Sequence, residues 1–444
     1  MWAGPSAIVG ALLIGALAAV SVPAALGALV LAGAGVAAYL LKSPALILHL
    51  LVLSVFIESL GVGPLRIGRV LAIGAIVAIA ARLVLSPWRP PTIPARAWLP
   101  VALLMMWAWA SGFWASSMGG WSFAMGQLGL AAAYFAAFAL FVDSPVQVRL
   151  LLRTFVIGAL VATVVGVSQW AAGARAVGYQ GDANLYALYQ VASIPAAVAL
   201  ARTASSAQRR WWLLALAPLA LSVLASESRG GLLATLVVIG YIVIRGDASS
   251  TAGKGRRGLV IVLGLASLVV LAIAGTTLNA RLDPEKISND RASGRLDIWH
   301  VAWRTFQDDP LTGIGGGNFV GQSVRLLERE PGVELLKSHL LDGEGIEVHN
   351  VYLETLVEYG LPGFGFYTLV IATSARGLHV GTRRFGRSTA LVALLPMLVA
   401  FVVGATFLSV VNSKLLWMLV GMGAAFQSMP FDRHAPAAIT RKTT

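Results

Sequence analysis

The stretch VHNVYLETLVEYGLPG, residues 348–363, begins with a histidine of the kind that does acid–base chemistry. Asn350 to Tyr359 is expected to form a short interfacial helix, with Tyr352 on its apolar side and His349 in its first turn. Unpaired N–H groups at a helix start disfavour imidazolium, so the ring would be neutral and able to accept a proton near pH 7. Glu347 could orient the ring or be a solvated loop carboxylate. Taken alone, His349 is more simply explained as a histidine that anchors the helix among lipid headgroups.

Two further polar stretches lie beside apolar runs. SESRGG, residues 226–231, contains Arg229, and arginine is costly at a membrane edge unless it faces a cavity or pairs with an anion. Glu227 could be that partner, but Ser228 and the adjacent glycines leave room for a ligand, which favours a binding role. GYQGDANLYALY, residues 178–189, contains Asp182, which suits a helix cap, and Asn184, which could hold a sugar or phosphate oxygen.

The long hydrophilic segment at residues 277–349 supplies further cations. Its first half, SNDRASGRLDIWHVAWRTFQDDP, has apolar residues at three- and four-residue spacing and predicts a helix that ends at Asp309 and Pro310. Arg295 falls on the same stripe as Trp299 and would point toward the membrane surface or a cleft at its edge. The following LTGIGGGNF lacks the strand and the GK[ST] of a phosphate-binding loop, so we expect a flexible turn.

These residues could together transfer a group from a diphosphate. A base such as His349 would remove the proton of an attacking hydroxyl, and arginines bind phosphate oxygens through two hydrogen bonds. Direct attack would invert the configuration at the anomeric carbon of a sugar. Asp308 and Asp309 form no metal-binding pair, because they lie at a predicted helix end beside Pro310. We therefore expect no divalent metal.

The elements that must position these residues are membrane-spanning helices. The chain has 444 residues, of which 57% are hydrophobic and 12% charged, with a mean hydropathy of +0.78. Apolar runs recur along the whole chain, and in lipid such segments must be helical. No cysteine is present, so disulfides and thiolate chemistry are excluded. The sequence predicts an all-α polytopic membrane protein with a mostly helical insert.

Hydropathy predicts 12–14 transmembrane helices. Basic clusters fall on alternate connections, which by the positive-inside rule places both termini in the cytoplasm and the insert on the outer side. The predicted spans lie at residues 6–22, 24–41, 45–61, 68–85, 97–115, 124–142, 150–171, 184–202, 211–226, 230–245, 258–276, 363–380, 389–409 and 413–428.

The ordered motifs resemble the signature of the O-antigen ligase and polymerase family of bacterial envelope enzymes. His349 and Asn350, followed by nine residues and then by Gly360 and Gly363, match its H-N-x₉-G-x-x-G motif. SESRGG is similar to its S-R-G element, and the insert with SGRLDIWHVAW is similar to its periplasmic loop. The resemblance covers roughly residues 170 to 428, whereas the first 150 residues show only hydropathy.

The resemblance implies a glycosyltransferase of the C-type architecture in the inner membrane of a Gram-negative bacterium. Such an enzyme takes glycan from undecaprenyl diphosphate at the periplasmic face, without a metal or a cofactor. A ligase moves O-antigen onto the outer core sugar of lipid A-core in lipopolysaccharide biosynthesis, whereas a polymerase extends the chain on its carrier. By motif, His349 corresponds to the essential histidine and Arg229 and Arg295 to the essential arginines, with Arg291 as a competing choice. Further substrate-binding candidates are Arg291, Asn350, Asn184, Ser228 and Tyr352.

This interpretation divides the chain into five parts. They are the N-terminal transmembrane helices at 1–276, a periplasmic loop domain at 277–349, the interfacial helix at 350–362, the C-terminal transmembrane helices at 363–428 and a cytoplasmic tail at 429–444. The length and position of the loop and the form of the histidine motif favour a ligase over a polymerase. A flippase or transporter of lipid-linked glycan is the alternative from another class, and it is disfavoured because the predicted spans contain few acidic residues for ion coupling.

Overall fold

The structure is a computed structural model that describes residues 43–62, 65–85, 87–245, 295–329, 345–386 and 389–429. Within these ranges the chain is helical apart from loops and one two-residue ladder, in which β1 (Gly61–Val62) pairs antiparallel with β2 (Leu65–Arg66). The prediction of an all-α polytopic membrane protein is confirmed. The longer helices before the insert are α3 (Pro44–Ser54), α4 (Ile67–Leu85), α5 (Ala95–Ala110), α6 (Met118–Phe141), α7 (Pro145–Ala171), α8 (Ala183–Thr203), α9 (Ser206–Leu214), α10 (Leu216–Ala225) and α11 (Arg229–Arg245).

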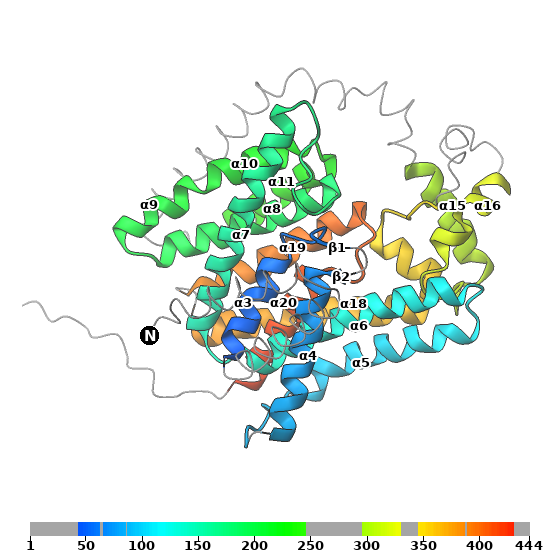
Figure 1. Cartoon of the computed structure of the whole chain (residues 1–444), viewed down its shortest axis with the longest axis horizontal. Helices are drawn as coiled ribbons and strands as arrows, with labels where there is room; N and C mark the ends of the chain where they lie inside the picture. Colours follow the sequence, from blue (N-terminus) through cyan, green and yellow to red (C-terminus); the bar gives the residue numbers. More distant parts are fainter. Residues whose placement is uncertain are drawn as a thin grey trace, which may run out of the picture.

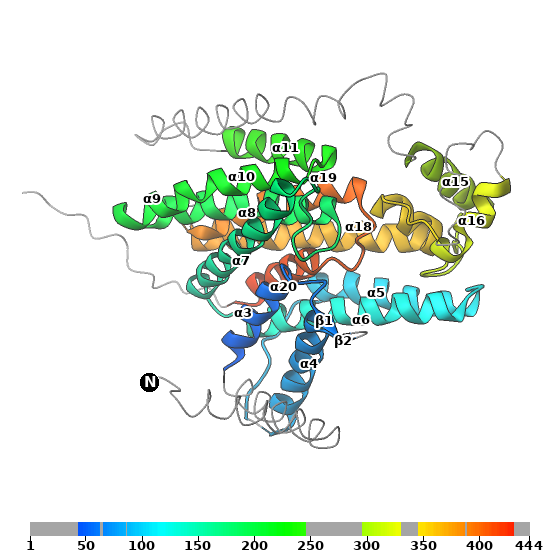
Figure 2. The same cartoon turned by 45° about the horizontal axis from the view of Figure 1, so that its top comes forward.

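The insert and the C-terminal part contain the remaining described helices. They are α15 (Arg295–Asp308), α16 (Phe319–Arg329), α18 (Val351–Phe385), α19 (Leu394–Gly404) and α20 (Lys414–Ser428), with 3₁₀ turns η1 (Ser111–Phe113), η3 (Ala390–Ala393) and η4 (Ala405–Phe407). Figures 1 and 2 show α15 and α16 together at one end of the molecule, next to the ends of α5, α6 and α18. The described part of the insert therefore lies at one end of the helical bundle.

Five helical segments in the described ranges are long and apolar enough to cross a membrane. They are Ile67–Leu85, Met118–Phe141, Pro145–Ala171, Ala183–Thr203 and Ala390–Phe407. The predicted spans at 97–115, 363–380 and 413–428 coincide with α5, part of α18 and α20. α5 and α20 are shorter, at 16 and 15 residues, and α18 has the length but is not among the five apolar segments. The predicted spans at 6–22, 24–41 and 258–276 lie outside the described residues, so the total of 12–14 stays a prediction.

One predicted span is divided in the structure. The segment at 211–226 is shared between α9, in which no residue is buried, and α10, which buries Leu216, Leu219 and Val223. Pro218 lies in the first turn of α10, where its missing N–H costs little. The exposed α9 therefore contributes no buried face to the predicted span.

α8 and α20 form the centre of the bundle. Every residue of α8 from Tyr186 to Ala201 is buried, as expected for a helix that is largely apolar on all sides and surrounded by other helices. α20 packs against α6 and α18. Gly377 of α18 lies against the backbone of Gly423 of α20, where a Cβ would come 2.2 Å from the Gly423 carbonyl oxygen. Small residues permit this close helix contact, as is typical of membrane bundles.

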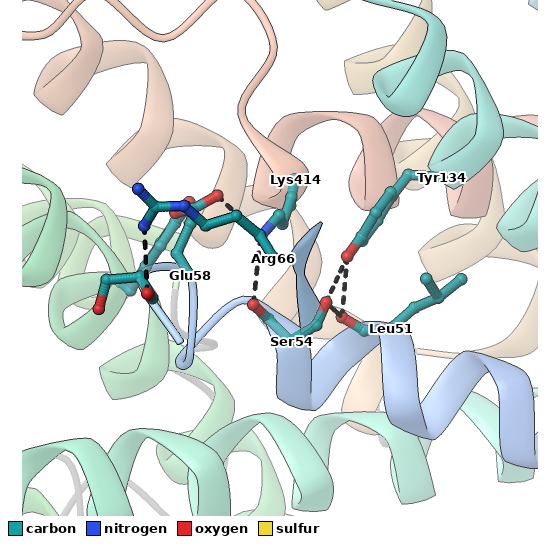
Figure 3. A network of polar contacts seen from close by, with 8 residues as sticks. Leu51, Ser54, Glu58, Arg66, Tyr134 and Lys414 are labelled. Carbon is teal, nitrogen blue, oxygen red and sulfur yellow. Dashed lines mark hydrogen bonds and ion pairs between the residues drawn. The ribbon is translucent and has the colours of Figure 1, made fainter. Parts of the chain in front are cut away.

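A network of polar contacts joins four helices (Figure 3). Lys414, the first residue of α20, lies with its Nζ 2.8 Å from Oε1 of Glu58 and donates to the carbonyl of Ser54 at the end of α3. Tyr189 of α8 donates to Oε2 of Glu58 at 3.4 Å, and the Ser54 and Tyr134 hydroxyls are hydrogen-bonded to each other. The Lys414 and Glu58 side chains are only 16% and 29% exposed. The attraction between the two charges therefore offsets part of the free energy that it costs to remove each of them from water.

A kink in α18 connects the insert to the bundle. Gly360 has a φ of 65°, and a Cβ there would lie 2.3 Å from the carbonyl oxygen of Leu311. Insert residues 310–315 run beside the kink and bond its backbone, with Leu361 N–H donating to Pro310, Ile314 N–H to Val357 and Gly315 N–H to Glu358 at 2.9 to 3.0 Å. These bonds satisfy backbone groups that the kink exposes. Gly360 and Pro362 fit this break, because glycine permits a positive φ and proline has no N–H to donate.

The glycine-rich loop between α15 and α16 differs from the flexible turn that we expected. Gly313, Gly315 and Gly317 all have positive φ, and the loop wraps around the buried side chain of Glu358. Oε2 of Glu358 accepts from Gly317 N–H at 2.9 Å, and Oε1 accepts from Phe319 N–H at 3.4 Å. The loop therefore holds a carboxylate of its own chain, and this contact fixes the start of α16 to α18.

Candidate active site

Two hydrogen bonds from other parts of the chain hold the backbone at His349. His349 precedes α18 and has a φ of 52°, a left-handed conformation that is unfavourable for a residue with a side chain. Its N–H donates to Oγ of Ser409, in the segment between η4 and α20, at 2.9 Å. The carbonyl of Val348 accepts from the indole N–H of Trp299 in α15 at 3.0 Å. Three elements that are distant in the sequence thus determine the position of this histidine.

Asn350 and Tyr352, both predicted to bind substrate, make structural contacts. Oδ1 of Asn350 accepts from the N–H groups of Tyr352 and Leu353 and caps α18. The hydroxyl of Tyr352 donates to the carbonyl of Val402 in α19 at 2.7 Å. His349 therefore lies one residue before the cap, outside the first helical turn in which we expected it.

The imidazole of His349 is half-buried among charged groups. Burial lowers its pKa below 6.5, the guanidinium of Arg295 lowers it further, and the carboxylate of Asp182 opposes both. The expected neutral ring is thus supported, although the main cause is burial. Nδ1 lies 3.9 Å from Oε2 of Glu347, whose own pKa is raised by burial and by Asp182. Glu347 therefore lies on the Nδ1 side of the ring.

Arg295 is the first described residue of α15 and belongs to the same charged group. Burial lowers its pKa, Asp182 opposes this, and the cations Arg175 and Arg229 lower it further. Its guanidinium carbon lies 6.0 Å from the ring centroid of Phe407, and the ring of Trp299 lies 6.5 Å from the same phenyl ring. The predicted common stripe of Arg295 and Trp299 is therefore correct, since both side chains reach one aromatic ring.

Arg229 is the first residue of α11. The preceding Ser228 is buried, and its hydroxyl accepts from Gly231 N–H at 3.0 Å and donates to Oδ1 of Asn184 at 2.7 Å. These bonds join the starts of α11 and α8. Asn184 and Ser228, both predicted to bind substrate, thus bind each other, and they fix the position from which Arg229 projects.

A narrow hollow, too small to admit a water molecule, lies beside this contact. Its polar lining is Asn184 and Ser228, and its apolar lining includes Leu188 and Phe407. Gly230 is packed so tightly against Phe407 that a Cβ would come 2.7 Å from the ring. Phe407 therefore lies against the start of α11 at the hollow and also against the guanidinium of Arg295.

Three residues of this site have roles that sequence reasoning missed, and the structure does not test a fourth candidate. Asp182 was predicted as a cap, and its Oδ1 does accept from the N–H groups of Asn184 and Leu185, but its charge also acts on His349, Arg295 and Glu347. Arg175, whose Nε donates to the Ser226 carbonyl, and Ser409 gave no local signal. Arg291 lies outside the described residues. In the described ranges no group of three or more His, Asp or Glu side chains could hold a metal ion.

The fold and the site define a polytopic membrane protein in which arginines and a histidine from separate helices act electrostatically on one another. Residues 214–368 match the sequence model of the O-antigen ligase family, and over this segment the chain is O-antigen ligase-like. The match runs from the end of α9 into α18 and contains Arg229, Arg295 and His349. No curated protein matches the chain.

Proposed function

We propose that the chain is an O-antigen ligase, which transfers O-antigen from undecaprenyl diphosphate to the outer core sugar of lipid A-core at the periplasmic face of the inner membrane. One observation carries the proposal. Arg229, Arg295 and His349 come from α11, α15 and the start of α18, yet Arg229 acts electrostatically on Arg295, and Arg295 on His349. A base and cations near each other are what glycosyl transfer from a diphosphate requires.

His349 is the general base of the proposed reaction. Its lowered pKa keeps the imidazole neutral at pH 7, and Nε2 accepts the proton of the acceptor hydroxyl as that oxygen attacks. Such proton transfer contributes roughly 10²- to 10⁴-fold to the rate. Glu347 lies on the Nδ1 side, where it stabilises the imidazolium that forms.

The arginines bind the diphosphate and stabilise its charge as it leaves. Guanidinium groups donate two parallel hydrogen bonds to phosphate oxygens, and such bonds strengthen where water is excluded. Arg295 is partly buried beside Phe407, and Arg175 adds a cation to the same group. These cations repel one another without a ligand, which favours binding of a dianion between them.

The proposed step is a single displacement. A bond forms between the acceptor oxygen and the anomeric carbon of the glycan, and the bond between that carbon and the diphosphate oxygen breaks. The electron pair leaves with undecaprenyl diphosphate, and the acceptor proton goes to His349. Because the acceptor attacks opposite the leaving group, the configuration at the anomeric carbon inverts.

The test is transfer by purified protein in vesicles that contain undecaprenyl diphosphate-linked glycan and lipid A-core. We expect lipid A-core to gain the mass of the glycan, and His349→Ala to lower the rate by roughly 10²- to 10⁴-fold. His300→Ala is the matched control, because His300 is an exposed histidine on α15. Growth of the carrier-linked glycan in place of lipid A-core would identify a polymerase, and full transfer by His349→Ala would exclude the proposed mechanism.

A further inference from the structure

Three large apolar side chains are exposed where the insert meets the bundle. Phe113, at the end of η1, is 93% exposed, Leu311, in the turn after α15, is 66% exposed, and Leu361, just after the kink of α18, is 50% exposed. We call these three residues the apolar rim. Leu311 is the member that belongs to the insert, so its surroundings decide what the insert contacts.

Backbone and indole hydrogen bonds fix the place of Leu311 in the rim. The N–H of Leu361 donates to the carbonyl of Pro310 at 2.9 Å, and the backbone of Leu311 lies directly against Gly360. The indole N–H of Trp114 donates to the carbonyl of Thr312 at 3.2 Å. Phe113 and Leu311 are each one residue from this bond. The turn at Leu311 is therefore level with the point where α18 kinks and its apolar run begins.

The rim continues two exposed apolar stripes of the bundle. On α18, Leu361 is followed by exposed Leu369, and on α5 exposed Met106 and Trp109 precede Phe113 at three- and four-residue spacing. In a membrane protein, exposed apolar stripes of this kind face lipid. The indole of Trp107 donates to the Tyr359 carbonyl at 2.7 Å, so tryptophans surround the kink as they do at membrane–water interfaces.

We propose that the apolar rim inserts into the acyl-chain boundary of one leaflet, so that the insert rests on lipid as well as on the helices. The partner is the bilayer itself, because the rim is continuous with the stripes of α5 and α18 that face lipid. Insertion fixes the depth of the turn at Leu311 and, through α15, that of Arg295. This inference does not depend on the proposed function.

The absence of cysteine from the sequence makes a direct test simple. Single cysteines at Phe113, Leu311 and Leu361 each take one nitroxide label in the full chain, reconstituted in vesicles of phosphatidylethanolamine and phosphatidylglycerol. Met106→Cys is the lipid-facing reference, and Glu328→Cys, at an exposed position on α16 of the insert, is the aqueous reference. Collision of each label with oxygen, which enters lipid, and with the polar complex Ni(II)-EDDA, which does not, reports its surroundings.

The label at Leu311 decides the outcome. We expect its collision rate with Ni(II)-EDDA to be about tenfold lower than at Glu328, because removing a polar group from water disfavours it by at least that factor. Its collision rate with oxygen should match that at Met106. A label at Leu311 that resembles Glu328 would place the turn in water, and one shielded from both reagents would place it under protein. Either result overturns the proposal, even if Phe113 and Leu361 face lipid.

Discussion

Replacing Ser409 by alanine removes the hydroxyl that accepts the N–H of His349 at 2.9 Å. A net hydrogen bond of this kind stabilises by about 0.5–1.5 kcal/mol, and a left-handed backbone at a residue with a side chain costs about 1–2 kcal/mol. The bond therefore offsets much of the cost of the φ of 52° at His349. Without it, the conformation that directs the imidazole to the substrate loses about 1 kcal/mol, which is about a fivefold change in its population.

The assay is steady-state glycan transfer by Ser409→Ala in vesicles. We expect kcat to fall about fivefold with the KM of donor and acceptor changed less than about twofold, because the change affects the position of the base and not the binding of either lipid. Ser409→Thr keeps a hydroxyl and should keep most of the rate. Ser428→Ala is the matched control, since that hydroxyl donates to Ala425 of its own helix. A full kcat in Ser409→Ala, together with a lower thermal stability, would refute the reasoning.

Three further predictions concern charge. The neutral form of His349 is lost as pH falls through its pKa, which Arg295 lowers and Asp182 raises. Arg295→Gln should therefore move the acid limb of the kcat/KM profile to higher pH. Asp182→Asn, which keeps the helix cap, should move that limb to lower pH. Limbs that move in the same direction, or stay in place, would contradict this. Lys414→Ala should lower the free energy of unfolding in detergent by about 1.5–3 kcal/mol, since Glu58 loses its charge partner, and a loss below about 0.5 kcal/mol would show that the pair contributes little. Transfer should keep its rate in EDTA, because arginines supply the positive charge; a loss that magnesium restores would disprove it.

The sequence predicted the helices best where an apolar run has a clear end signal. The span expected at 184–202 is α8 (Ala183–Thr203), and the cap expected at Asp182 is present. The kink at Gly360 was also predictable, because glycine and proline break helices by their own backbone geometry. The glycine-rich loop was misjudged. Its order depends on the carboxylate of Glu358, about forty residues later, and no local pattern carries that information.

The candidate site was predicted in its parts and not in its arrangement. Arg229 and Arg295 were identified from residue type and position, and their electrostatic contact is a property of the folded chain. Ser409 was missed because it accepts a hydrogen bond from a residue sixty positions away. Asp182 was assigned one role although it has two, since its carboxylate caps α8 and also acts on His349.

The number of residues between His349 and Gly360 fixes the distance between the imidazole and the kink of α18. Between them, the nine residues from Val351 to Tyr359 form about 14 Å of helix, at 1.5 Å per residue. One end of this segment is locked to the insert at Leu311, and the other presents the imidazole. Adding a single residue between them would raise the ring by about 1.5 Å and rotate it by about 100° around the helix axis. The number of residues in the motif thus sets both the position of the base along the helix axis and its orientation around that axis, whichever side chains occupy the positions between.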